Sequence, residues 1–383
     1  MDTTHTPNGT DTARGRYQLI AAEVSLYSGK ARAYLRYKGV PFDEVLATRP
    51  VIQSIVRPKT GLAMVPVLLT PEGEAIQDTT AIIHAIEARH PARSVVPSGV
   101  LGLASKLLEL YGDEWLLMPA MHYRWHYKRN WPLVFSEFGQ LVAPGIPKVL
   151  APLAGIPLAA YFGGNYGRAL GISKRNRAAI ERSYEAFLRD FDRHLEQHDY
   201  LLGDRPCEGD FGFMAPLYAH LYRDPASGDL MRRIAPKVAA WVERMNRPVS
   251  THAPETRTFA SEVPRSLDPI FERLFSEHWP VVADTVRAVD RWVHAHPDAE
   301  YIKRFVGTHT FAIEGVPHQR WIQSFTQWMA QHPLDAYAAL DDDTRASADA
   351  WLRRVGGYEA MQTRIPTRVR RKHNRLVPET TRG

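Results

Sequence analysis

Short apolar runs alternate with helically spaced apolar residues over the first quarter of the chain. Strands are predicted where apolar residues follow one another over a few positions, at residues 17–22, 41–47, 65–69 and 74–77. Helices are predicted where apolar residues recur at spacings of three and four, at residues 30–38, 51–56 and 81–90. The resulting β-α-β-α-β-β-α order predicts a small sheet flanked by helices, which is a thioredoxin-like arrangement.

The pattern changes after a linker rich in Pro, Ser and Gly at residues 91–99. Helical periodicity then dominates, at residues 101–127, 175–198, 210–222, 230–245, 267–294, 319–332 and 343–355. One further segment, residues 301–316, has a strand-like pattern. The predicted fold class is therefore α/β plus all-α, with a thioredoxin-like N-terminal domain, a helical domain and a mostly helical C-terminal extension.

Positive charge is concentrated at the C-terminus. The 383-residue chain has a net charge of +6, and residues 364–383, with seven basic residues and one acidic residue, account for all of it. We interpret residues 362–383 as a basic, disordered tail and the polar residues 1–16 as a disordered leader. The predicted domains between them are residues 17–92, residues 100–248 and a helical extension, residues 249–361, packed on the helical domain. Because the body is formally neutral, no nucleic-acid partner is predicted.

The single cysteine, Cys207, excludes an internal disulfide framework and disfavours a structural zinc cluster. His122 and His126 are four residues apart, as a metal pair on one helix would be, but no third ligand has a suitable spacing. No metal is therefore predicted. Residues 1–16 show no signal-peptide pattern, which together with the cysteine count favours a cytoplasmic location.

Residues 141–162 are the one stretch that is apolar enough to suggest a membrane segment. They contain Pro144, Pro147, Pro152 and Pro157, which would break a spanning helix repeatedly. The favoured interpretation is an apolar loop or broken helix pair that covers a cleft. Contact with a membrane surface is the less favoured alternative.

A proline interrupts the third predicted strand, at Val65-Pro66. Proline within a strand is tolerated when the preceding bond is cis and the freed backbone faces a ligand. Asp78-Thr79-Thr80 then opens the next helix, where side-chain oxygens and free amides form an anion-receptive helix start. The pattern predicts a peptide-binding edge with a cis bond before Pro66. A plain helix N-cap is the alternative for Asp78 and Thr79.

Several short motifs occur in a fixed order within residues 17–246. They are residues 25–32 and 38–42, the run Val65-Pro66-Val67-Leu68, the pair Asp78-Thr79 followed by Ala81-Ile82, and residues 200–206 followed by Asp210-Phe211. In this order they resemble the cytosolic glutathione S-transferase superfamily, in which a thioredoxin-like domain precedes an all-helical domain. The resemblance says nothing about residues 250–383.

The resemblance implies that glutathione is the co-substrate. The backbone of Val65, next to Pro66, would pair with the cysteinyl part as an added strand. Asp78 and Thr79 would hold the γ-glutamyl end. Met64 stands where many relatives carry a polar contact, which leaves Lys59 or a more distant basic group to meet the glycyl carboxylate, or leaves it unmet.

The resemblance also places a thiolate-stabilising hydroxyl in the first loop. A free thiol has a pKa of about 8.5, and a hydroxyl donor at a helix start can lower that value. Ser25, seven residues before Arg32, is the preferred candidate, and Tyr27 and Ser28 are the other hydroxyls of this loop. A serine that only caps the following helix is the structural alternative.

Aromatic, methionine and histidine residues crowd the end of the predicted helix 101–127. The set includes Trp115, Met118, His122 and Trp125. Such a composition suits an apolar pocket for an electrophile. Packing of the C-terminal helices on the same surface is an equally good explanation.

The predicted function is that of a glutathione transferase of the detoxification type, in which a glutathione thiolate attacks an apolar electrophile. Its partners would be glutathione and an apolar small molecule, with a homodimer possible and membrane contact not expected. The rival is a non-catalytic binding or scaffold protein with the same fold. Met64 and the large extension favour the rival, whereas Ser25, Pro66 and the Asp78-Thr79 pair favour the enzyme.

Overall fold

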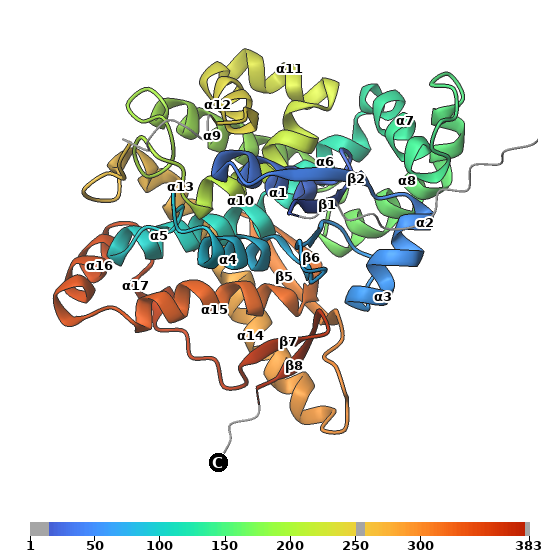
Figure 1. Cartoon of the computed structure of the whole chain (residues 1–383). Coiled ribbons are helices and arrows are strands. Elements are labelled where there is room, and N and C mark those ends of the chain that lie inside the picture. Colours follow the sequence, from blue (N-terminus) through green and yellow to red (C-terminus); the bar gives the residue numbers. More distant parts are fainter. Residues whose placement is uncertain (1–14, 250–256, 380–383) are drawn as a thin grey trace, which may run out of the picture.

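The protein is described by a computed structural model that covers residues 15–249 and 257–379. Three parts pack together: a small sheet domain, a helical domain and a C-terminal extension that crosses beneath both (Figure 1). The expected leader falls almost wholly on residues outside the described ones.

The N-terminal domain is a four-stranded sheet in the order β2-β1-β3-β4. Its strands are β1 (Tyr17–Ala21), β2 (Phe42–Leu46), β3 (Val67–Leu69) and β4 (Ala75–Gln77), with β1 and β2 parallel and the other pairs antiparallel. Its helices are α1 (Leu26–Lys38), α2 (Arg49–Val51), the π-helical turn η1 (Ile52–Val56), α3 (Arg57–Thr60) and α4 (Thr79–Arg89).

Successive side chains along the strands point to opposite faces of the sheet, so an apolar layer forms on each face. Leu19 and Leu68 belong to the main core with α1 and α4, whereas Ile20 and Val67 belong to a second cluster on the other face of the sheet. That second cluster also holds residues of η1 and of two later helices, α7 (Trp131–Val142) and α8 (Ala151–Ala169). The proline-rich residues 141–162, expected to be an apolar loop or a broken helix pair, hold the end of α7 and most of α8, and this helix pair packs against the N-terminal domain.

The remaining helical domain follows the predicted periodicity with more breaks. Its elements are α5 (Gly99–Leu110), η2 (Tyr111–Trp115), α6 (Leu117–His126), η3 (Lys128–Asn130), α9 (Arg177–His194), α10 (Glu208–Pro216), η4 (Leu217–Tyr222), α11 (Pro225–Ile234) and α12 (Pro236–Asn246). None of the helices within residues 15–249 and 257–379 is long and apolar enough to cross a membrane.

The C-terminal extension mixes helices and two hairpins. Its elements are η5 (Arg265–Leu267), α13 (Asp268–Arg273), η6 (Leu274–His278), α14 (Trp279–Ala295), β5 (Phe305–Ile313), β6 (Val316–Gln323), α15 (Phe325–Ala338), α16 (Asp342–Arg354), α17 (Tyr358–Met361), β7 (Val369–Lys372) and β8 (Arg375–Pro378). Its buried residues, among them Phe271, Met329 and Trp351, share the main core with the helical domain. The predicted fold class is confirmed.

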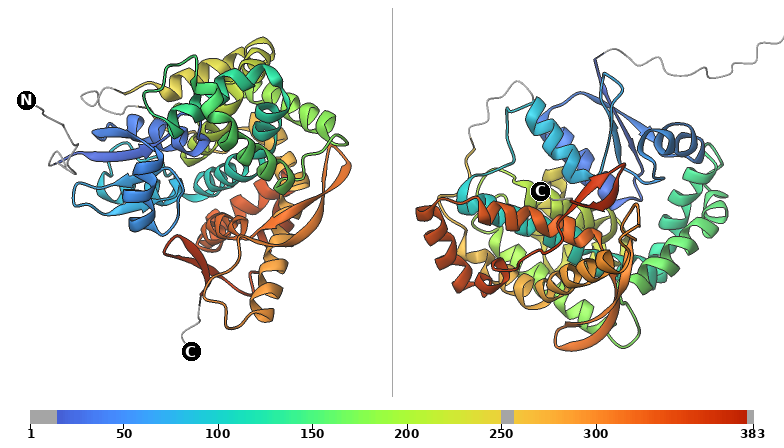
Figure 2. Two further views of the ribbon diagram at one scale, coloured as in Figure 1. Left: turned by 90° about the vertical axis from the view of Figure 1, so that its right-hand side faces the viewer. Right: turned by 90° about the horizontal axis from the view of Figure 1, so that it is seen from below.

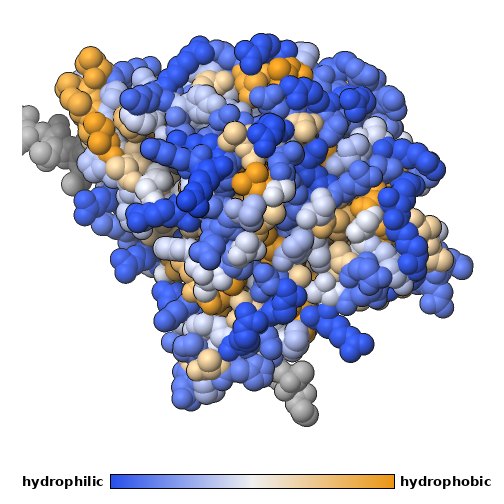
Figure 3. Space-filling view, turned by 180° about the vertical axis from the view of Figure 1, so that it is seen from behind, coloured by the Kyte–Doolittle hydropathy of each residue, from blue (hydrophilic) through white to orange (hydrophobic). Residues whose placement is uncertain are grey.

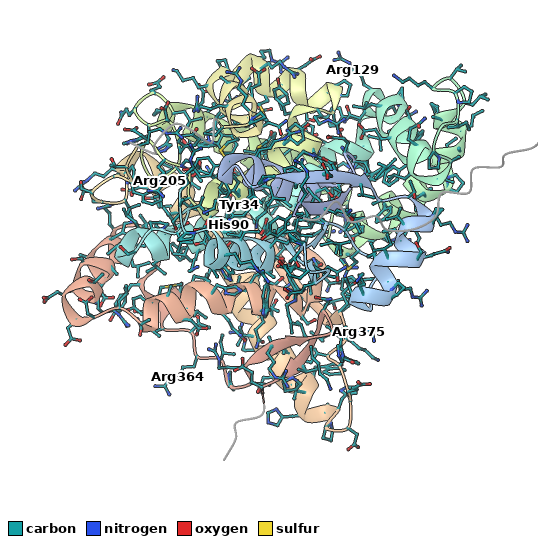
Figure 4. The ribbon with its side chains drawn as sticks, in the orientation of Figure 1. Tyr34, His90, Arg129, Arg205, Arg364 and Arg375 are labelled. Atoms are coloured by element: carbon teal, nitrogen blue, oxygen red, sulfur yellow. The ribbon has the colours of Figure 1, made fainter. Side chains whose placement is uncertain are left out.

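Two expectations about the extension are wrong. Residues 316–323, the last five of which fall in the helix expected at 319–332, form strand β6, because alternate side chains such as Arg320 and Ile322 face inward. The tail expected to be disordered from residue 362 forms the β7–β8 hairpin instead. Val369 and Leu376 are buried with Val289 and Ile302, while basic residues such as Arg375 point outward (Figure 4).

Candidate functional site

Three chain segments meet at one edge of the sheet. The end of β1 leads into the Ser25 loop, and β3, which runs antiparallel to β1, begins directly after Val65-Pro66. Strand β4 is antiparallel to β3 and pairs Gln77 with Val67, so Asp78 follows at the same edge. The topology therefore brings together the three motifs that the sequence singled out.

The first loop contains three hydroxyls with different surroundings. The Ser28 hydroxyl is fully buried and accepts from the Ala22 amide at 3.2 Å. The Tyr27 hydroxyl donates to the Asp113 carbonyl at 3.0 Å, and burial, followed by the charges of Glu114 and Asp113, raises its pKa well above the usual value. Ser25 is half-buried and caps α1 by accepting from the Ser28 amide at 3.3 Å. Neither serine hydroxyl donates to an acceptor within the described residues, and Ser25 is the less buried of the two.

The loop is anchored from the helical domain. Arg124 is fully buried and donates to the Val24 carbonyl at 2.6 Å, while its other nitrogens bind the buried Asp224 at 2.7 and 2.8 Å. His220 contacts the same carbonyl at 3.3 Å. These bonds hold the backbone next to Ser25 in place.

The bond between Val65 and Pro66 is cis, as predicted. Within the described residues the structure shows no hydrogen-bond partner for the backbone of Val65. The preceding loop is fixed by Gln77, whose side-chain amide donates to the Met64 carbonyl at 2.7 Å, and the Met64 side chain is 47% exposed. The edge at Val65 therefore offers an unpaired amide and carbonyl to an extended peptide.

Asp78 caps α4 in a conformation that is uncommon for a non-glycine residue. Its φ is 88°, and its carboxylate accepts from the Ala81 amide at 3.1 Å. Such backbone geometry costs about 1–3 kcal/mol, and proteins retain it where it positions a functional side chain. The amides of Thr79 and Thr80 have no partner among the described residues, so the helix start is open to an anion.

An arginine from the C-terminal hairpin β7–β8 reaches the start of α4. Arg371 donates to the Gln77 carbonyl at 2.7 Å and lies 3.7 Å from the Asp78 carboxylate. The hairpin turn is tied down by Asn374, which accepts from Arg371 at 2.6 Å and donates to the Thr60 carbonyl at 2.9 Å. The hairpin thus lies against the N-terminal domain (Figure 2, right). Sequence reasoning missed Arg371 because it counted the residue as part of a disordered tail.

Lys59 does not reach this edge. Its ammonium donates to the carbonyl of Gly73 at 3.1 Å, and Gly73 lies in the β3–β4 turn, at the opposite end of these strands from Pro66. Of the alternatives for the glycyl carboxylate, the structure therefore does not bring Lys59 to this edge. The short helix α3 runs past β4 and carries Lys59 away from the site.

A buried ionic cluster lies behind the site. Lys30 of α1 donates to Glu109 at 2.7 Å and to Asp113 at 2.5 Å, and all three side chains are at least 95% buried. Burial raises the pKa of Asp113 to about 8, against the opposing pull of Lys30. For Glu109, the effect of burial is outweighed by Lys30, and Thr80 adds a hydrogen bond at 2.8 Å, so that its pKa falls to about 2. The cluster joins the sheet domain to the helical domain.

The aromatic end of the helical segment is mostly covered. Trp115 and Met118 are 2% and 0% exposed, and Trp115 stacks on His278 of the extension at 5.3 Å. His122 is buried and contacts Glu181 at 2.8 Å. Trp125 is half-buried against Phe138. Packing of C-terminal elements on this surface, the alternative to a pocket, therefore accounts for the burial of Trp115.

The extension instead brings polar groups to the aromatic end of the helical segment. Thr326 donates to the buried Glu114 at 2.6 Å, and Arg304 donates to the Tyr166 hydroxyl at 3.1 Å. Arg320 is 3% exposed, and two of its nitrogens have no partner within the described residues. Burial, partly offset by Glu114, lowers the pKa of Arg320 to about 10.

Two cavities lie away from the sheet edge. One of about 310 Å³ opens between η4 and α12 and is lined by residues such as Tyr218 and Asn246. A second, of about 10 Å³, is enclosed between Trp115, Tyr184 and Ile313. Neither of these two cavities includes Ser25, Pro66 or Asp78. No group of three potential metal ligands occurs in the part of the chain that the structure describes.

Comparison with known proteins agrees with the motifs at this edge. Residues 19–94 match the family model described as the N-terminal domain of glutathione S-transferase. No curated protein matches the chain.

Similar solved structures include several glutathione S-transferases. One from Methylobacterium radiotolerans, in complex with glutathione sulfonate, is 21% identical, covers 65% of this chain and 100% of its own, and has a TM-score of 0.40. The beta-etherase LigF of a Sphingobium strain is 17% identical, with 67% and 99% coverage and a TM-score of 0.43. The glutathione transferase GSTFuA3 of Phanerochaete chrysosporium is 15% identical, with 62% and 99% coverage and a TM-score of 0.45.

Residues 19–94 include the Ser25 loop, the cis bond before Pro66 and the Asp78-Thr79 helix start. This N-terminal segment is therefore similar to the N-terminal domain of glutathione S-transferases.

Proposed function

We propose that the protein is a glutathione-dependent transferase in which Ser25 stabilises the thiolate of bound glutathione. The thiolate would attack an electrophilic carbon of a second substrate, forming a carbon–sulfur bond while the leaving group departs or a proton is taken up. The observation that carries this proposal is the half-buried Ser25 hydroxyl at the start of α1, whose proton has no acceptor within the described residues and which lies on the same sheet edge as the unpaired backbone of Val65.

In this proposal Asp78 and Arg371 recognise the two charges of the γ-glutamyl end. The ligand ammonium would pair with the Asp78 carboxylate. The ligand α-carboxylate would accept from the open amides of α4 and from the guanidinium of Arg371, which lies beside them. An arginine and an aspartate 3.7 Å apart present the charge pattern that complements an amino-acid zwitterion.

The site of the second substrate is less apolar than the sequence suggests. Trp115, Met118 and His122 are covered, which leaves Tyr27, Trp125 and Tyr166 as half-buried aromatic groups in this region. The same covering of the site favours one rival, a protein that keeps the fold for binding alone. Glutathione binding without turnover would support that rival.

Ser25→Ala is expected to slow conjugation at least about tenfold while changing glutathione affinity little, because the lost hydrogen bond acts on the thiolate. The pKa of bound glutathione, followed by thiolate absorbance in the ultraviolet, should rise toward that of the free thiol. Tyr27→Phe is the matched control, since the Tyr27 proton is already donated to Asp113. If Tyr27→Phe shifts the titration and Ser25→Ala does not, the assignment of Ser25 is wrong.

Arg371→Ala is expected to weaken glutathione binding by about 10- to 100-fold, the usual cost of a charge-assisted hydrogen bond of about 1.5–3 kcal/mol. Calorimetric titration should compare glutathione with an analogue that lacks the α-carboxylate of the glutamyl residue. The loss should vanish for the analogue, which a merely structural role for Arg371 would not produce.

Arg370→Ala is the control for Arg371, because Arg370 is the neighbouring residue on the exposed face of β7. It should leave both affinities unchanged. A rise in glutathione affinity in Arg371→Ala would show that the guanidinium blocks the ammonium position at Asp78, and the recognition role would be rejected.

A further inference from the structure

The helix pair α7–α8 carries an exposed apolar surface that the proposed function does not use. We call it the α8 surface and define it by its large side chains, Val142, Val149, Leu150, Leu153, Ile156 and Tyr161, which are 43–81% exposed. These are six of the ten large hydrophobic residues exposed in the described part of the chain, so they form a group and not a random scatter. The surface appears as the orange column at the upper left of Figure 3.

The exposure is a consequence of how the helix pair is built. A Cβ at Gly155 would lie 1.9 Å from the Phe135 carbonyl, and one at Gly139 would lie 1.9 Å from the Ala151 carbonyl, so the two backbones touch. One side of α8 is fixed against α7 by this close approach. A helix packed on one side ordinarily carries polar residues on the other, whereas residues 149–167 contain no charged side chain at all.

The charge around this surface has one sign. Residues 138–180 contain five basic residues and no Asp or Glu. Residues 45–71, which include α2 and α3, contain three basic residues and again no acid, and η1 shares an apolar cluster with Leu141 and Leu158. Lys148, Arg49 and Arg57 are exposed and make no ion pair within the described residues.

We propose that the α8 surface docks on a membrane surface that contains anionic lipids, with α8 lying along the interface. Aliphatic side chains and Tyr161 would enter the boundary between headgroups and acyl chains, while the neighbouring cations contact lipid phosphates. The prolines of this segment exclude a spanning helix, but they do not prevent a helix pair from lying on the surface. The sequence argument against membrane contact therefore applies to crossing alone.

A second copy of the chain is the main competing occupant. A symmetric dimer through this surface would bring Lys148 and its neighbouring cations toward the same cations of the other copy, without an acid in either segment to pair with them. An anionic lipid layer matches both the apolar and the basic character. Charge complementarity thus favours the lipid.

The test is co-sedimentation of the full chain with phosphatidylcholine vesicles made with and without phosphatidylglycerol. Binding is expected to vesicles with the anionic lipid, to be weaker without it, and to fall as salt is raised. The double variant Leu153→Glu and Ile156→Glu should lower the partition constant at least about tenfold, because two apolar side chains lose their burial. Val96→Glu with Trp321→Glu is the matched control, since both residues are exposed outside the α8 surface and the control should bind as the unmodified chain does.

Two results would overturn the proposal. One is equal partition of the Leu153→Glu and Ile156→Glu variant and the unmodified chain, which would show that binding, if any, does not involve α8. The other is an absence of vesicle binding together with a concentration-dependent dimer that the same variant converts to a monomer, measured by sedimentation velocity. Circular dichroism of each variant shows that the fold is retained before either comparison is made.

Discussion

A protein that ends at Met245 is expected to be recovered as an aggregate or as a compact state without fixed packing. The extension shares its core with the helical domain, and Trp115, Tyr111 and Leu334 belong to a single cluster of buried residues. Without the extension, Trp115 loses His278 and Phe311, which contact its ring at 5.3 and 6.1 Å.

Exposure of one tryptophan of about 150–250 Å² costs roughly 4–6 kcal/mol at about 25 cal/mol per Å². That amount is a large share of the stability of about 5–15 kcal/mol that ordinary proteins have. Glu114 would also lose its hydrogen bond to Thr326. Soluble yield, near-ultraviolet circular dichroism and binding of a hydrophobic dye measure the outcome. A soluble, cooperatively folded protein ending at Met245 would show that the extension is dispensable for the fold.

The same reasoning changes the expectation for the last twenty residues. Sequence composition alone indicates that residues 364–383 can be removed without harm. In the structure their loss would uncover Val289 and Ile302, which Val369 and Leu376 cover, and would also remove Arg371 from the site. We expect this shorter truncation to lower thermal stability as well as glutathione affinity.

The parts of the site that could be predicted from sequence are local in the chain. Ser25 and Asp78 are recognisable because a capping residue and the helix that it starts are neighbours in sequence, and Pro66 because proline is unusual at a strand start. Arg371 contacts Gln77 across a sequence separation of 294 residues. No local pattern carries that contact.

The fold likewise divides into elements that local sequence patterns predict and elements that they do not. Strand β6 was mistaken for helix because its apolar residues, Val316, Trp321 and Ile322, are few and its polar residues are many, so its alternation is weak. The terminal hairpin was not predicted because the basic residues of this segment outnumber its two anchoring apolar residues. These two residues, Val369 and Leu376, fix the hairpin to the core. In both cases tertiary packing, and not local preference, decides the structure.

Lys30→Met is expected to destabilise the protein by about 3–5 kcal/mol, because breaking a buried ion pair leaves a charge without a partner. Lys30 is fully buried and serves two carboxylates, Glu109 and Asp113, whose side chains are 3% and 5% exposed. One oxygen of Asp113 has no hydrogen-bond partner even in the intact cluster. Removal of the ammonium would therefore leave the buried Glu109 without its cation and Asp113 without its hydrogen-bond donor.

The stability that Lys30→Met loses should grow as the pH rises. In the intact protein the pKa of Asp113 is already raised to about 8, so the folded state holds a proton that the unfolded state releases. Stability must then fall as pH rises from the unfolded carboxyl pKa of about 4 toward 8. Without Lys30 the carboxyl groups lose the charge that lowers their pKa. The stability of Lys30→Met should therefore fall more steeply with rising pH than that of the intact protein.

Urea unfolding of both proteins at several pH values from 5 to about 9 measures this difference. Combining Lys30→Met with Glu109→Gln and Asp113→Asn removes all three charges, and it should recover part of the stability and flatten the pH dependence, since no uncompensated charge remains buried. Arg16→Ala is the control for charge removal at the surface: Arg16 and Asp43 are about half exposed, and the loss should stay below about 1 kcal/mol. Equal, pH-independent losses in Lys30→Met and in Arg16→Ala would show that the buried cluster contributes no more than a surface pair, and the account of the junction between the two domains would have to be abandoned.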